Sequence, residues 1–197
     1  MNISGKRITL RAVEREDLAL LHKWANDPDV AGLLGELHFP SSLLQQERWY
    51  ERIQADRDTV RLSVVRNEGG LIGYSGFWHI DWRDRRAEHA VLLGDPKCRG
   101  QGYGCEVILS CARYAFEQMA LHRLEARVLE ANEASLAAYR SCGFVAEGAL
   151  REYAVRSGRR VDMILLGLLS EEYTKHIEET RYWEAPEDVE PSFADSV

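Results

Sequence analysis

Three glycines just before an apolar helical pattern are the first residues of this sequence that could do chemistry. They belong to a six-residue stretch made of Arg99, Gly100, Gln101, Gly102, Tyr103 and Gly104. Glycine in the first turn of a helix costs backbone entropy, so something should offset that cost. Backbone N–H groups at a helix N-terminus attract anions, and glycine lets an anion approach the backbone closely. The stretch therefore predicts a phosphate-binding loop.

The spacing of the glycines excludes two familiar nucleotide-binding loops. The dinucleotide fingerprint Gly-x-Gly-x-x-Gly would need a third glycine at position 105, which is a cysteine. A Walker loop would need Gly-Lys followed by Ser or Thr, and no such sequence follows. The pattern that fits is Arg/Gln-x-x-Gly-x-Gly/Ala between a strand and a helix. An ordinary glycine-rich turn is the alternative interpretation.

A second segment, residues 132–144, argues against an ordinary turn. Its sequence is Asn-Glu-Ala-Ser-Leu-Ala-Ala-Tyr-Arg-Ser-Cys-Gly-Phe. Together with the loop, and with a helix and a strand between them, it resembles the GNAT superfamily of acyl-CoA-dependent N-acyltransferases over about residues 7–168. Two shorter patterns, Leu10-Arg11 followed by Asp17 and Arg85-Arg-Ala-Glu88, resemble the branch of ribosomal-protein-alanine and polyamine acetyltransferases.

The resemblance implies a binding site for acetyl-CoA, used as the acyl donor, and no metal. In the family, the glycine loop wraps the pyrophosphate of coenzyme A. The resemblance assigns Asn132 and Ser135 to the pantetheine arm, and Asn132 could also cap the helix that follows it. It further implies that backbone groups of Leu92 and Leu93 face the thioester, because the family's strand splays from its neighbour there. The six histidines show no metal-ligand spacing.

Acyl transfer from a thioester to an amine needs an acid for the leaving thiolate and a base for the ammonium. Tyr139 occupies the tyrosine position of the motif, and a phenol with a pKa of about 10 stays protonated at neutral pH. We therefore expect Tyr139 to be the acid. Glu88 lies eleven residues before Arg99, a spacing at which related histone-type acetyltransferases carry a catalytic glutamate. Glu88 is the candidate base, and an ion pair with Arg85 or Arg86 is its alternative role.

Composition narrows the function classes further. The chain has 197 residues, 45% of them hydrophobic, and a formal net charge of −7 that residues 169–197 carry alone. The lack of a basic stripe argues against a nucleic-acid partner. No run approaches the roughly 18–20 apolar residues of a membrane span. The four cysteines, at positions 98, 105, 111 and 142, form no Cys-x-x-Cys pair, which favours free thiols and a cytoplasmic location.

Hydrophobic periodicity predicts the elements that must position these residues. The expected strands are 8–12, 60–66, 71–78, 87–93, 123–128, 144–155 and 159–168. The expected helices are 14–26, 42–55, one from the glycine loop to about 119, 133–142 and 170–177, with a loop at 29–41. The fold class is α/β, a single mixed, mostly antiparallel central sheet of about seven strands with helices on both faces. Residues 1–168 would form the acetyltransferase domain and 169–197 an acidic extension, a short helix and then a flexible tail.

The acceptor is the least determined part of the reaction. Residues 30–49 and 78–86 should border its pocket, and they hold aromatic and acidic side chains that suit a small amine with an apolar body. We therefore expect acetyl transfer to a small-molecule primary amine by direct attack in a ternary complex. A protein N-terminal amine is the second hypothesis, and a non-catalytic acyl-CoA-binding module is the third. A homodimer, with the acidic tail across the partner, is left open.

Overall fold

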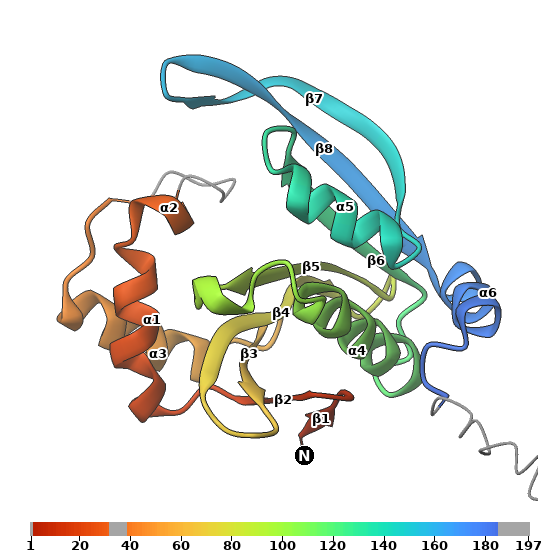
Figure 1. The fold of residues 1–197 in the computed structure, drawn as a ribbon, viewed down its shortest axis with the longest axis horizontal. Helices are drawn as coiled ribbons and strands as arrows, with labels where there is room; N and C mark the ends of the chain where they lie inside the picture. Colours follow the sequence, from red (N-terminus) through yellow and green to blue (C-terminus); the bar gives the residue numbers. More distant parts are fainter. Residues whose placement is uncertain (1, 32–38, 185–197) are drawn as a thin grey trace, which may run out of the picture.

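A single eight-stranded sheet runs through the computed structural model, which describes residues 2–31 and 39–184, in the order β1-β2-β3-β4-β5-β6-β8-β7 (Figure 1). The strands are β1 (Ile3–Ser4), β2 (Ile8–Ala12), β3 (Val60–Arg66), β4 (Leu71–Asp81), β5 (Arg86–Leu93), β6 (Arg123–Leu129), β7 (Val145–Arg156) and β8 (Arg159–Leu169). Neighbouring strands are antiparallel except β5 and β6. The predicted fold class is confirmed, and the two-residue β1 is the strand that periodicity could not detect.

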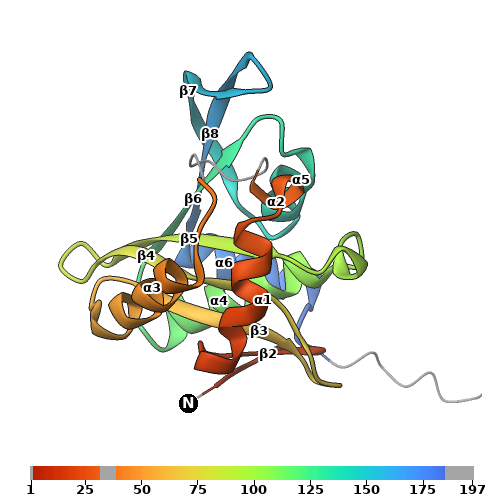
Figure 2. The ribbon, with the colours of Figure 1, turned by 90° about the vertical axis from the view of Figure 1, so that its left-hand side faces the viewer.

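Helices lie on both faces of this sheet. They are α1 (Leu18–Ala25), α2 (Pro28–Ala31), α3 (Leu43–Ala55), α4 (Tyr103–Glu117), α5 (Glu133–Ser141) and α6 (Ser170–Thr180), with short 3₁₀ turns η1 (Arg15–Asp17) and η2 (Pro96–Cys98). Figure 2 looks from the side of α1 and α3 and shows α4 and α6 behind them. In the described part of the chain no helix has both the length and the apolar character to cross a membrane.

The predicted loop at 29–41 is wrong at its start, because α2 forms there. The Asp27 side chain accepts a hydrogen bond from the Asp29 N–H at 2.9 Å, and Pro28 is favourable at the first position of a helix. Residues 32–38 of the expected loop lie outside the described residues. The predicted start of α3 is confirmed, since Ser42 accepts a hydrogen bond from the Gln45 N–H in a capping box.

Buried apolar side chains form one cluster on each face of the sheet. Successive side chains of a strand point to opposite faces. Tyr74 and Leu92 consequently pack with α1 and α3, whereas Phe77 belongs to the cluster built on α4 and α5. Phe77 pairs with His89 across β4 and β5, so His89 faces α4 and its neighbour Glu88 faces the opposite side.

A buried ion pair explains the Leu-Arg pattern near the N-terminus. The Asp17 carboxylate, 5% exposed, accepts two hydrogen bonds from Arg11 at 2.6 and 2.8 Å and one from the Ser63 hydroxyl at 2.6 Å. Burial by itself raises the pKa of Asp17, but the hydrogen bonds from Arg11, Ser63 and the Glu14 N–H outweigh it, so that its pKa is lowered. The pair ties the start of α1 to β2 and β3, and thereby sets where α1 lies.

The described part of the C-terminal extension packs against the domain. Tyr173 of α6 is buried in the α4 cluster. The Arg113 guanidinium lies 3.9 Å from the centre of the Trp183 ring, and Lys6 lies 4.7 Å from that of Tyr182. Residues 170–184 therefore cover one end of the same core, and the tail predicted to be flexible, 185–197, lies outside the described residues.

Candidate active site

The sheet opens between β5 and β6. These parallel strands pair only over Arg86–Glu88 and Arg123–Glu125, although β5 continues to Leu93 and β6 to Leu129. Beyond Glu88 the two strands part, which leaves backbone N–H and C=O groups of their inner edges free of a β5–β6 ladder. Such groups must find other partners. The opening lies where the sequence predicted the thioester.

The glycine loop has the conformation that only glycine adopts cheaply. Gly100 and Gly102 have φ values of +72° and +80°, in the left-handed region that disfavours a Cβ. Gly102 is the N-cap of α4 and brings no capping side chain, and the first N–H groups of a helix have no acceptor within it. A Cβ on Gly100 would meet no protein atom within 4 Å. These residues therefore fit a diphosphate bound from the open side.

Arg7 holds the loop from beneath, a contact that sequence reasoning missed. Its guanidinium donates to the Gln101 carbonyl at 3.0 Å and lies 4.4 Å from the centre of the Tyr103 ring. The same group pairs at 2.8 Å with Glu106, whose side chain is fully buried. Arg7 lies 99 residues before Glu106 in the chain, so no local pattern could reveal the pair. Arg7 and Glu106 fix the loop against the start of α4.

Tyr139 lies at the point where β5 and β6 part. The phenol is 2% exposed, and its hydroxyl donates to the His89 carbonyl at 3.1 Å and lies 3.0 Å from the His89 Nδ1. His89 is the first residue of β5 beyond the last β5–β6 pair. Burial is the main cause that raises the pKa of Tyr139 well above its usual value. The phenol is therefore fully protonated at neutral pH, as an acid requires.

His89 and Ser75 orient the Tyr139 hydroxyl and were not predicted as site residues. The Ser75 hydroxyl donates to the Ala90 carbonyl at 2.8 Å, so it can only accept from His89 Nε2, 3.0 Å away. We assign the proton of His89 to Nε2 on this basis, which leaves Nδ1 as an acceptor for Tyr139. Burial lowers the pKa of His89 to about 3, so the ring stays neutral. Two polar residues on an inward strand face were the signal for this network.

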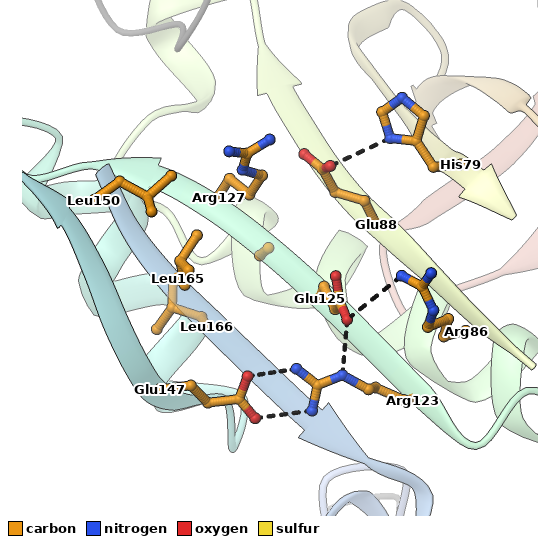
Figure 3. Close-up of a pocket in the computed structure, with 11 residues that line it drawn as sticks. His79, Arg86, Glu88, Arg123, Glu125, Arg127, Glu147, Leu150, Leu165 and Leu166 are labelled. Carbon is orange, nitrogen blue, oxygen red and sulfur yellow. Dashed lines mark hydrogen bonds and ion pairs between the residues drawn. The ribbon is translucent and has the colours of Figure 1, made fainter. Parts of the chain in front are cut away.

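Glu88 faces a pocket on the other side of β5. The pocket has a volume of about 530 Å³ and is lined by residues of β4, β5, β6, β7 and β8 (Figure 3). The Glu88 carboxylate lies 3.4 Å from the His79 Nδ1. The alternative role of Glu88 assigned its charge to Arg85 or Arg86, but Arg86 instead contacts Asp81 at 3.5 Å and Glu125. Glu88 is thus placed at the last β5–β6 pair with its carboxylate toward an open pocket.

The two segments predicted to border the acceptor lie at different hollows. His79 and Arg86 line the pocket of Glu88. Trp49 lines a smaller hollow of about 260 Å³ between α1, α3 and the sheet, together with Trp24 and Leu92. Glu36 and His38 of the first segment lie outside the described residues. Among the described residues of the two predicted segments, only those of 78–86, His79 and Arg86, line the pocket of Glu88.

The remaining predicted ligands of coenzyme A fall on both sides of the opening. Asn132 caps α5 by accepting from the Ser135 N–H at 3.1 Å, so its capping role is real and its pantetheine role stays a prediction. The Leu93 carbonyl accepts from the Arg99 guanidinium at 3.4 Å, at the parted edge of β5. The Leu92 carbonyl lies against Gly73 of β4. This geometry favours Leu93 over Leu92 as the backbone contact for the thioester arm.

Metal ligands are not brought together in the described ranges. Within residues 2–31 and 39–184, no three or more His, Cys, Asp or Glu side chains are arranged to hold a metal ion. The four cysteines are free thiols. The surroundings of Cys98 and Cys105, which flank the glycine loop, shift the pKa values of the two thiols in opposite directions.

We expect Cys105 to react with thiol reagents well before Cys98. A side-chain hydrogen bond from Cys142 is the main cause that lowers the pKa of Cys105 to about 6, whereas burial raises that of Cys98. The Cys105 thiolate therefore forms at a lower pH than that of Cys98, and its rate of alkylation by iodoacetamide should reach a plateau at the lower pH. Mass spectrometry of the alkylated peptides measures both rates.

Cys105→Ser is the control, and acetyl-CoA should protect Cys105, which lies in the first turn of α4. Equal rates at both thiols would contradict the expectation.

Comparison with known proteins places this geometry in a family. Residues 7–145 match the family described as an acetyltransferase (GNAT) domain. The chain is 31% identical over 175 residues to the N-acetyltransferase p20 of Bacillus licheniformis, covering 85% of this chain and 96% of that protein. It is 28% identical over 174 residues to the spermidine N(1)-acetyltransferase of Vibrio cholerae, covering 88% and 99%.

A solved structure agrees with these relatives. The spermidine N-acetyltransferase of Vibrio cholerae, crystallised with CoA and spermine, superposes with a TM-score of 0.79 at 29% identity and covers 85% of this chain and 98% of that one. The opened sheet, the glycine loop at the start of α4 and the tyrosine of α5 are the features that the sequence resemblance predicted. The chain belongs to the GNAT acetyltransferase family and is an acetyl-CoA-dependent N-acetyltransferase.

Proposed function

We propose that this enzyme transfers an acetyl group to the primary amine of a small molecule by direct attack in a ternary complex. One observation carries the proposal: the candidate base and the candidate acid lie on opposite faces of β5, at neighbouring residues of the strand. Glu88 is the last residue of β5 paired to β6 and faces the pocket, and His89, the next residue, binds the Tyr139 hydroxyl from the opposite face. Acetyl-CoA, held at the glycine loop, supplies the acetyl thioester.

Glu88 is suited to take a proton from the incoming ammonium. Its side chain is 24% exposed and lies in the pocket beside His79, whose own side chain is 79% exposed. A carboxylate in that position can accept the proton directly or through one water molecule. The neighbouring opening between β5 and β6 lets a deprotonated amine on this face approach an acetyl thioester held between the two strands.

Tyr139 is suited to protonate the leaving thiolate from the other face. Its hydroxyl hydrogen is held by the carbonyl and Nδ1 of His89, and rotation about the Cζ–Oη bond redirects it without moving the ring. Burial excludes water from the phenol. The proton is therefore donated at one atom in a site where charge interactions are strong.

The size of the pocket supports a small acceptor. About 530 Å³ lies within the range of small-molecule sites, and the relatives from Vibrio cholerae are named for a polyamine. A peptide N-terminus is the second candidate, because one side of the pocket is open. We also propose a cytoplasmic location, supported by the four free thiols; a homodimer stays a prediction.

A thiol-release assay tests the proposed function. The purified chain is incubated with acetyl-CoA and polyamines, amino sugars, aminoglycosides, amino acids or short peptides, with reactions lacking amine as the control for thioester hydrolysis. We expect release that requires a small amine and a product heavier by one acetyl group in mass spectrometry. Release with peptides alone would favour the N-terminal acetyltransferase. Binding of acetyl-CoA without release with any amine would favour the binding module.

A further inference from the structure

Most charges in the pocket of Glu88 neutralise one another. Arg123 joins β6 to β7 by donating to both Glu147 carboxylate oxygens, one of them at 2.8 Å, and its Nε donates to Glu125 at 2.9 Å. Arg86 reaches the same Glu125 carboxylate from β5. These four side chains form the network of dashed lines in Figure 3. These ion pairs link β5, β6 and β7, and within them each charge is balanced by an opposite charge.

Two opposite charges of the pocket are left over. Within the part of the chain that the structure describes, the one ion-pair contact of Glu88 is with the exposed His79 ring, at 3.4 Å. Arg127 lies 5.4 Å from the centre of the Tyr153 ring, and among the described residues no carboxylate lies within ion-pair distance of it. Both residues line the pocket and project into it in Figure 3.

The register of the sheet sets how far apart the two charges are along the strands. Glu88 of β5 pairs with Glu125 of β6, and Arg127 follows two residues later on the same face of β6. Two residues advance a strand by about 7 Å, and the advance is toward the side where β5 and β6 part. A ligand whose amine reaches Glu88 would thus bring a group a few bonds away to Arg127.

The overall charge of the lining also bears on the ligand. The pocket is lined by three arginines and three glutamates, so it has no excess of negative charge to attract a polycation. A polyamine with one ammonium group at Glu88 would place another near Arg127, where like charges repel. An acceptor with one positive and one negative group would match both unused charges.

We infer that the acceptor is a small amine that also carries an anionic group, with an amino acid as its simplest form, and that Arg127 binds the anionic group. The inference rests on the proposed function, because it takes the pocket of Glu88 as the acceptor site. A guanidinium binds a carboxylate or a phosphate with paired N–H donors. Arg127 is therefore a specificity-determining residue and takes no part in the proton transfers.

Matched acceptors test the inference. Alanine, leucine, phenylalanine and lysine are each assayed as the free acid, the carboxamide and the decarboxylated amine, at equal concentrations of unprotonated amine, beside spermidine and 2-aminoethyl phosphate. We expect kcat/KM for at least one free acid, or for the phosphate, to exceed that of the counterpart that lacks the anionic group by about 10-fold or more. Ethylamine is the neutral counterpart of the phosphate. The acid and phosphate arms distinguish the two sources of the anionic group.

Two arginine variants locate the effect. Arg127→Gln should remove the preference for the anionic acceptor while changing kcat/KM for the neutral one less than about 3-fold. Arg151→Gln changes an exposed arginine of β7 that does not line the pocket, and it should retain the preference. Calorimetry with the preferred acceptor and protein saturated with CoA should show binding weakened about 10-fold or more only in Arg127→Gln.

The outcomes separate this inference from the proposed function. Turnover of neutral amines or spermidine in preference to the anionic acceptors, with Arg127→Gln unchanged, would overturn the inference and leave the proposed function standing. An equal loss on every acceptor in Arg127→Gln would also overturn it, because the residue would then act on structure. Absence of turnover with every amine, spermidine included, would overturn both.

Discussion

Tyr139→Phe should lower kcat by roughly 100-fold to 1,000-fold, the size of a lost general acid, with less than about a 3-fold change in KM for acetyl-CoA. The change removes only the hydroxyl, which lies at the His89 carbonyl where β5 and β6 part. The phenyl ring would keep its edge contact with Phe144, so the fold should lose about 1–3 kcal/mol, the cost of leaving a buried acceptor without its donor. Steady-state kinetics with the preferred amine and thermal unfolding measure both effects.

Tyr173→Phe is the matched control for this change. Tyr173 is a second buried phenol, 4% exposed, and its hydroxyl accepts from the Trp183 Nε1 at 3.2 Å on the far side of α4. It should show a similar loss of stability and an unchanged kcat. Burial raises the pKa of Tyr139. At every pH up to about 9, ionisation of this phenol should therefore cause no decrease in the wild-type kcat. A kcat within about 3-fold of wild type in Tyr139→Phe would remove the assigned acid role.

Gly102→Asp should raise KM for acetyl-CoA by about 100-fold with a smaller change in kcat. The new carboxylate would lie at the N-cap of α4, where the loop is expected to hold a diphosphate. Two unit charges about 5 Å apart near a protein surface repel by about 3 kcal/mol, which corresponds to a change in affinity of about 100-fold. Isothermal titration with CoA measures the effect directly.

The hairpin between β7 and β8 offers a matched control for the backbone strain of this substitution. Gly158 has φ of +75°, close to the +80° of Gly102, and open space around it. Gly158→Asp therefore imposes the same left-handed conformation on an aspartate far from the glycine loop. The two variants share the backbone strain, although only the aspartate at 102 lies beside the Arg7 guanidinium, and only Gly102→Asp should lose affinity for CoA. Equal affinities would show that the diphosphate is not held at residues 100–104.

The two faces of β5 divide the chemistry of this enzyme. His89 turns toward α4 and α5, where Tyr139 and Ser75 complete a buried and neutral network. Glu88 turns toward an open pocket with charged walls. The proposed acid, Tyr139, is thus held from the buried face of β5, and the proposed base, Glu88, lies on its open face, because successive side chains of a strand alternate between its two faces. The opening between β5 and β6 is the point where both faces are within reach.

Local patterns in the sequence were enough to locate most elements and both motifs. The bounds of β2 and β3 were predicted to the residue, because alternating apolar side chains identify a half-buried strand. The start of the helix at residue 42 was predicted because serine is a good N-cap, and the structure shows Ser42 in a capping box. The glycine loop was found from the spacing of its glycines before a helix, and the structure shows left-handed backbone at Gly100 and Gly102. Each of these requirements involves residues close together in the chain.

The parts that sequence reasoning missed all join distant segments. Arg7 and Glu106 meet across 99 positions of the chain, and Tyr139 and His89 across 50. The alternative role of Glu88 was an ion pair with Arg85 or Arg86, whereas the structure places His79, which lies in the bulge between Trp78 and Asp81, beside its carboxylate. Arg127 is a single charged residue on a strand, which no sequence pattern marks as a site residue. Its place in the pocket wall, without a carboxylate at ion-pair distance among the described residues, is visible only in the structure.

The sequence by itself determined the fold class, the glycine loop before α4 and the tyrosine of α5, because these depend on backbone conformations and short-range spacing that a linear pattern records. Only the tertiary structure decided which backbone carbonyl faces the opening, what holds the phenol, and which charges in the pocket of Glu88 have no ion-pair partner among the described residues. Those properties depend on strand register and on pairing between side chains far apart in the chain. Register and pairing are settled when the sheet assembles, and no segment contains them alone.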